Sequence, residues 1–100
     1  MPRKLWRDLP EFFIRTAQQE GWSAFRNGEL LRRASATFDV LVTVDQNMRH
    51  QQNVSQLPIG LVAIEVPDTR LIHLRPLVPQ LREAIRTVKP GDIIVVRPEK

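Results

Sequence analysis

Three apolar runs rich in β-branched residues constrain the fold of this chain more than any other feature. They are FDVLVTV at residues 38–44, IGLVAIEV at 59–66 and DIIVV at 92–96. A strand with one solvent-facing side alternates apolar and polar residues, whereas a strand covered on both faces is apolar nearly throughout. The runs therefore predict the buried strands of a mostly parallel sheet.

Stretches with helical spacing separate these runs. Residues 2–9 predict a short helix that ends before Pro10, and NGELLRRASA, with Asn27 as N-cap, predicts a second helix. Between the last two runs, apolar residues recur every three or four positions and predict a third helix. Because of Pro76 and Pro79, its regular part begins late or its start is kinked. Its apolar positions are Leu74, Leu77, Val78, Leu81, Ile85 and Val88.

Residues 12–17 (FFIRTA) predict one more strand. Alternating strands and helices with short connections predict an α/β fold, in which a small, mostly parallel sheet has flanking helices. We expect a single domain over residues 1–100. Ligands of such sheets bind beyond the carboxyl ends of the strands, which selects residues 43–47 and those after Val66 as the region to search.

The composition narrows the classes of function. Without cysteine, the chain has no disulfide and no thiolate metal site, which fits a reducing cytoplasm. No apolar run approaches the roughly 18 residues of a membrane span and no signal-peptide core is evident, so we expect a cytoplasmic protein without a membrane partner. The net charge of +4 fits either a mildly basic surface or affinity for nucleic acid. His50 and His73 do not have metal-ligand spacing, and we expect His73 at the flank of a helix start.

Two carboxylates are candidates for chemistry. Asp45 ends a predicted buried strand, where it can bind Mg²⁺ or Mn²⁺ or simply cap the following turn. Glu29 lies at a predicted helix start, where the helix macrodipole alone explains an acid. Both elements should open on the same edge of the sheet, so the two residues could form part of one metal site. Metal-dependent nucleases gather about three or four such ligands.

Three stretches together resemble a known family. GWSAFRNGELLRRA, FDVLVTVDQNMRHQQN and LRPLVPQLREAIRTVKPGDIIVV are similar to short PIN-like proteins of bacteria, which are related to the toxin ribonucleases of toxin–antitoxin systems. The resemblance implies a PIN-like fold, Mg²⁺- or Mn²⁺-dependent hydrolysis of RNA, and RNA or an antitoxin-like protein as partner. On matching positions it implies Glu29 and Asp45 as catalytic metal ligands and Asn47 as a weaker ligand. The implied contacts to RNA phosphates are Arg32, Arg33, Arg49 and His50.

Relatives of this kind begin with a strand that ends in an acidic motif, L-D-E-x-L-P, and MPRKL matches only the tail of that motif. We therefore expect the first strand and its acids to be missing, either because the start codon lies upstream or because the strand was lost. The expected function is that of a PIN-like domain weakened or inactive as a ribonuclease. The alternative is a non-catalytic module that binds a protein or itself.

Loss of that strand would leave unpaired edges beside residues 12–17 and 38–44. It would also leave an uncovered apolar face with Trp6, Phe12, Phe13 and Trp22. Open edges recruit other strands, so we expect a homodimer.

Overall fold

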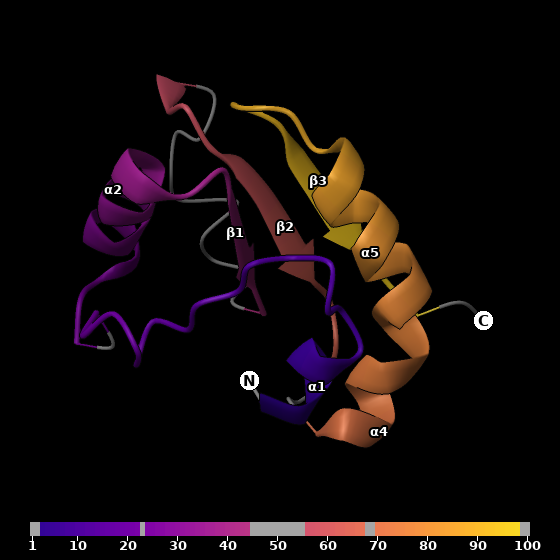
Figure 1. Cartoon of the computed structure of the whole chain (residues 1–100). Helices are drawn as coiled ribbons and strands as arrows, with labels where there is room; N and C mark the ends of the chain where they lie inside the picture. The colour runs from indigo at the N-terminus through magenta and orange to yellow at the C-terminus, as the bar shows by residue number, and fades with distance from the viewer. Residues whose placement is uncertain (1–2, 23, 45–55, 68–69, 99–100) are drawn as a thin grey trace.

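Three parallel strands form the sheet of this protein. The computed structural model describes residues 3–22, 24–44, 56–67 and 70–98 (Figure 1). Strands β1 (Val40–Thr43), β2 (Gly60–Ile64) and β3 (Ile93–Val96) lie in the order β1-β2-β3. Val62 of β2 lies beside Val42 of β1 and Ile94 of β3, and both pairings are parallel. Each of the three apolar runs thus contains a strand, which confirms the predicted small parallel sheet.

Helices connect and flank these strands. They are α1 (Arg3–Arg7), α2 (Asn27–Thr37), α4 (Leu71–Leu74), the 3₁₀ helix η2 (Arg75–Leu77) and α5 (Val78–Thr87). Pro76 lies in η2 and Pro79 in the first turn of α5. Proline lacks the backbone N–H and is tolerated in a first helical turn, so the regular helix begins only at Val78. This confirms the predicted late start.

The two faces of the sheet have separate cores. Alternate strand residues point to opposite faces. Val62 and Ile64 pack on α5 and α1 in the larger core, whereas Leu61 packs on Leu31 and Ala34 of α2 in the smaller one. Figure 1 accordingly shows α2 and α5 on opposite sides of the sheet. The predicted flanking helices are therefore confirmed.

Burial differs between the strands that were predicted to be covered on both faces. All five residues of β2 are buried, whereas all four residues of β1 are only half-buried. The sheet order explains the difference, because β2 is the central strand and β1 ends the sheet.

The strand predicted over residues 12–17 is wrong, since this segment is irregular and belongs to no sheet. Phe12 and Ile14 pack against the larger core, and Phe13 between them is 84% exposed. Phe12 and Ile14, two positions apart, are thus half-buried against the core although their backbone pairs with no strand. The predicted open edge beside residues 12–17 is wrong for the same reason.

Arginines far along the chain hold the segment of residues 3–16, here called the N-terminal segment, on the core. Leu5 and Leu9 of this segment are fully buried. The Arg82 guanidinium donates to Glu11 Oε2 at 2.9 Å and to the Asp8 carbonyl oxygen at 2.5 Å. Arg75 Nε lies 3.6 Å from Asp8 Oδ2. The segment is thus part of the folded domain.

Most of the predicted uncovered apolar face is covered. Trp6 and Phe12 pack on the larger core, and Trp22 packs on the smaller one. Trp22 also meets Phe38 edge to face, with ring centroids 6.0 Å apart. Of the four residues named for that face, only Phe13 is exposed.

Candidate functional site

The amino end of α2 carries three of the residues predicted for function. Arg26 is the N-cap residue, with extended backbone, and its carbonyl oxygen accepts from the Leu30 N–H at 2.8 Å. The prediction of Asn27 as N-cap is therefore wrong by one position, since Asn27 is the first helical residue. Glu29 lies in the first turn, where the helix macrodipole favours a negative charge.

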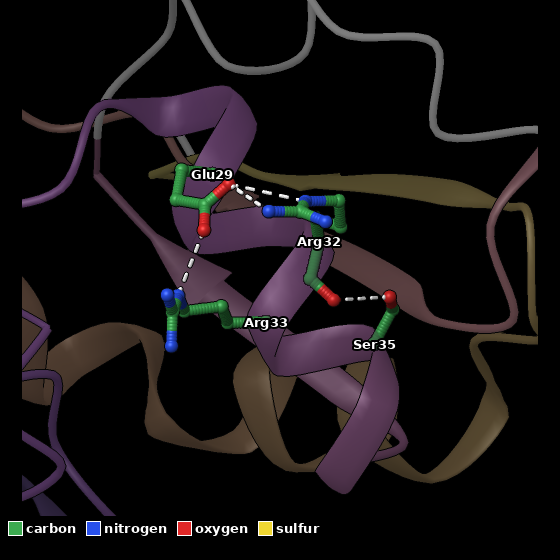
Figure 2. A network of polar contacts seen from close by, with 4 residues as sticks. All are labelled: Glu29, Arg32, Arg33 and Ser35. Atoms are coloured by element: carbon green, nitrogen blue, oxygen red, sulfur yellow. Dashed lines mark hydrogen bonds and ion pairs between the residues drawn. The ribbon is translucent and has the colours of Figure 1, made fainter.

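Both carboxylate oxygens of Glu29 accept hydrogen bonds from arginines of the next turn (Figure 2). Arg32 donates to Oε2 from Nε at 3.0 Å and from Nη2 at 2.5 Å. Arg33 Nε donates to Oε1 at 2.8 Å. The hydrogen bond from Arg32, followed by that from Arg33, holds the pKa of the Glu29 carboxyl below its usual range.

The two arginines present their guanidinium groups differently. The Arg33 guanidinium carbon lies 4.5 Å from the centre of the Phe25 ring, a cation–π contact that fixes this side chain between ring and carboxylate. The Arg32 side chain is 71% exposed. Ser35 Oγ donates to the Arg32 carbonyl oxygen at 2.7 Å, a contact that Figure 2 also draws. The helix thus brings Glu29, Arg32 and Arg33 into one exposed network.

The other predicted site residues are Asp45, Asn47, Arg49 and His50, which lie outside the described residues. The described chain reaches Val44, just beyond β1. Helix α2 runs opposite to β1, so that its amino end and the carboxyl end of β1 point the same way (Figure 1). This direction agrees with the expectation that Glu29 and the residues after β1 open on one edge of the sheet.

A divalent cation at Glu29 would have to compete with two guanidinium groups for the carboxylate oxygens, and it would meet their positive charge. Among the described residues, no group of three or more His, Cys, Asp or Glu side chains could hold a metal ion.

The carboxyl ends of β2 and β3 carry further charged contacts. Arg97 Nε donates to Glu65 Oε2 at 2.9 Å, and the Glu65 N–H donates to the Val96 carbonyl oxygen at 2.8 Å. Sequence analysis did not identify this pair. The pair follows from the register of the structure, in which Ile64 lies beside Val96 and the next two residues therefore share a face.

His73 and Asp8 each lie beside an arginine. His73 lies half-buried in α4, as expected for the flank of a helix start, and its Nε2 is 3.2 Å from Arg70 Nη2. Asp8 is paired with Arg75.

Comparison of the chain with protein-family models, with curated proteins and with solved structures finds no match. Within the described part of the chain, none of the helices has the length and apolar character that crossing a membrane requires.

Proposed function

We propose that this chain is a PIN-like domain of the cytoplasm that holds RNA through its backbone phosphates and does not cut it. The resemblance of three sequence stretches to PIN-like proteins supports the family, and a small parallel sheet with helices on both faces is compatible with it. The absence of cysteine supports a location in the reducing cytoplasm.

The observation that carries the proposal is the pairing of both Glu29 oxygens with Arg32 and Arg33. The pairing opposes metal binding at Glu29, because a cation would have to compete with two guanidinium groups. It also holds two guanidinium groups on an exposed helix face, and Arg26 adds a further exposed cation one turn earlier. These four side chains carry a net charge of +2, from three arginines and one glutamate, which favours a polyanion.

Binding of a fluorescently labelled single-stranded RNA to the full chain tests the proposal. Arg32→Ala should weaken binding on the order of threefold and lower the salt slope by about 0.7, as expected for the loss of one phosphate contact. Arg86→Ala is the matched control, because Arg86 is an exposed cation on α5, outside this network. Equal weakening by both variants would contradict a site on α2. Binding of an acidic protein in place of RNA would contradict the RNA proposal.

A working metal-dependent ribonuclease is the second candidate function. The shared direction of the amino end of α2 and the carboxyl end of β1 favours it, because Asp45 follows β1 in sequence. We expect no cleavage of RNA with Mg²⁺ or Mn²⁺ and little heat on titration of Mn²⁺ by calorimetry. Submillimolar Mn²⁺ binding that disappears in Asp45→Ala would favour the enzyme instead, and cleavage of RNA that is lost in the same variant would establish it.

A further inference from the structure

Phe25 is an aromatic residue that lies outside both cores. It directly precedes the N-cap residue of α2, and its N–H donates to the Trp22 carbonyl oxygen at 3.0 Å. The ring is half-buried, yet among the described residues it packs with neither the larger core nor the smaller one. The guanidinium carbon of Arg33 lies over the ring, 4.5 Å from its centre. Core packing therefore does not account for an aromatic residue at this position.

Two contacts fix the plane of the Arg33 guanidinium. One of its faces lies on the Phe25 ring, and its Nε donates to Glu29 Oε1 at 2.8 Å. The N–H bonds of a guanidinium lie in its plane, so the ion pair with Glu29 uses an edge of the group and leaves its second face free. The Arg33 side chain is still 49% exposed with both contacts made, and Figure 2 shows it extending away from the helix. The face turned away from Phe25 is thus open.

We propose that this open face of Arg33 stacks on a nucleobase, so that the site on α2 holds RNA by a base as well as by phosphates. The inference rests on the proposed RNA binding and adds a base subsite to it. Nucleobases stack on guanidinium planes and on aromatic rings. Phe25 beneath Arg33 makes a stack of ring, cation and base, in which the plane of the cation is set before the ligand arrives.

The chemistry of the site favours a nucleobase over other anionic ligands. The exposed arginines of the network attract phosphate groups, as they would on any polyanion. A bare polyphosphate or an acidic peptide offers oxygens for the edges of the guanidinium groups, but no flat surface for the open face of Arg33. RNA carries flat π systems on an anionic backbone, so it satisfies the face and the charges together.

Two ligands of equal charge test the proposal on the full chain. One is a fluorescently labelled oligoadenylate of about ten nucleotides, and the other is an abasic ribose-phosphate oligomer of the same length. Both carry the same phosphates, so the ratio of their dissociation constants reports the contribution of the bases. Fluorescence anisotropy should show the oligoadenylate bound about fivefold or more tightly than the abasic oligomer.

Charge-conserving variants assign this preference to Arg33. Arg33→Lys keeps the charge and loses the planar face, so the preference for the oligoadenylate should fall about threefold or more. Arg32→Lys is the matched control, because it makes the same change in the same network away from the ring. It should weaken both ligands by the same factor. Phe25→Leu keeps an apolar side chain but removes the ring, and it should lower the preference as Arg33→Lys does. Urea unfolding checks that all three variants keep the fold.

The outcomes separate this inference from the proposed function. Equal affinity of the unchanged chain for the two ligands would overturn the base subsite and leave binding through phosphates standing. A preference that Arg32→Lys and Arg33→Lys lower equally would also overturn the subsite, because the stacked arginine would then have no special role. Binding of neither ligand would overturn the proposed function, and the base subsite with it.

Discussion

At the scale of single residues, Glu29 shows how an acid at a predicted site can have a structural role. Its position in the first turn of α2 is explained by the helix macrodipole, as the sequence indicates. Its partners follow from helical spacing, because residues three and four positions apart lie on the same helix face. The spacing E-x-x-R-R therefore predicts the pairing with Arg32 and Arg33. The match of Glu29 to a catalytic position of PIN-like proteins does not predict this pairing.

The lowered pKa of Glu29 makes a prediction for acid unfolding. A carboxyl whose pKa is depressed in the folded state stabilises the protein at pH values above 4.5, the ordinary pKa of the group. This contribution is lost as the pH falls through the folded-state pKa. The free energy of unfolding should therefore fall less between neutral and acidic pH in Glu29→Gln than in the unchanged chain. Urea unfolding followed by tryptophan fluorescence at several pH values measures it.

The control for this prediction is Asp39→Asn, which changes an exposed acid just beyond α2. Its side chain makes no ion pair with the described residues, so the variant controls for the removal of one exposed carboxylate. A Glu29→Gln curve that coincides with the unchanged one at every pH would show that the contacts of Glu29 are lost in solution.

At the scale of elements, strands β1, β2 and β3 and helix α5 could be predicted from the spacing of their apolar residues. The strands lie in continuous apolar runs, and the apolar residues of α5 recur every three or four positions. The irregular segment of residues 12–17 could not. Phe12 and Ile14 are half-buried against the larger core and Phe13 is exposed, which is the period-two pattern of a strand. Periodicity reports which side chains are buried. It does not report whether the backbone pairs with a neighbouring strand.

Alanine substitution of the two adjacent phenylalanines tests the burial of this segment. Phe12→Ala should lower the free energy of unfolding by about 2 kcal/mol, because a half-buried ring leaves the larger core. Phe13→Ala should change it by less than about 0.5 kcal/mol, because the ring is 84% exposed. Urea unfolding measures both variants. Similar losses in the two would mean that this segment packs differently from the arrangement described.

At the scale of the whole molecule, the sheet divides the domain into two unequal halves. Among the described residues, ten buried ones form the core beneath α1 and α5, and four form the core beneath α2. The layered α/β architecture follows from the order of elements in the sequence. The inequality does not follow from that order, and the N-terminal segment increases it by adding Leu5 and Leu9 to the larger core. On the candidate site, the resemblance named Glu29, Arg32 and Arg33 as site residues without predicting that they pair, while the roles of Asp45, Asn47, Arg49 and His50 stay predictions.

This inequality predicts a difference in local stability across the sheet. Amides of α2 should exchange with deuterium faster than those of β2 and α5, because fewer buried contacts oppose the opening of α2. Hydrogen exchange followed by mass spectrometry measures this order. The amides of β2 should be the slowest, since this strand serves both cores. Protection of α2 equal to that of β2 would contradict two cores of different strength.

The attachment of the N-terminal segment through Arg82 has a consequence for synthesis of the chain on the ribosome. Asp8 and Glu11 are made long before Arg82, at separations of 74 and 71 residues. Leu5 and Leu9 must therefore stay without their packing partners until α5 and then β3 have emerged. Contacts between such distant residues slow folding and prolong the exposure of apolar surface. The larger core can close only after α5 and β3 have emerged, and until then a chaperone that shields short apolar segments has its target in the N-terminal segment.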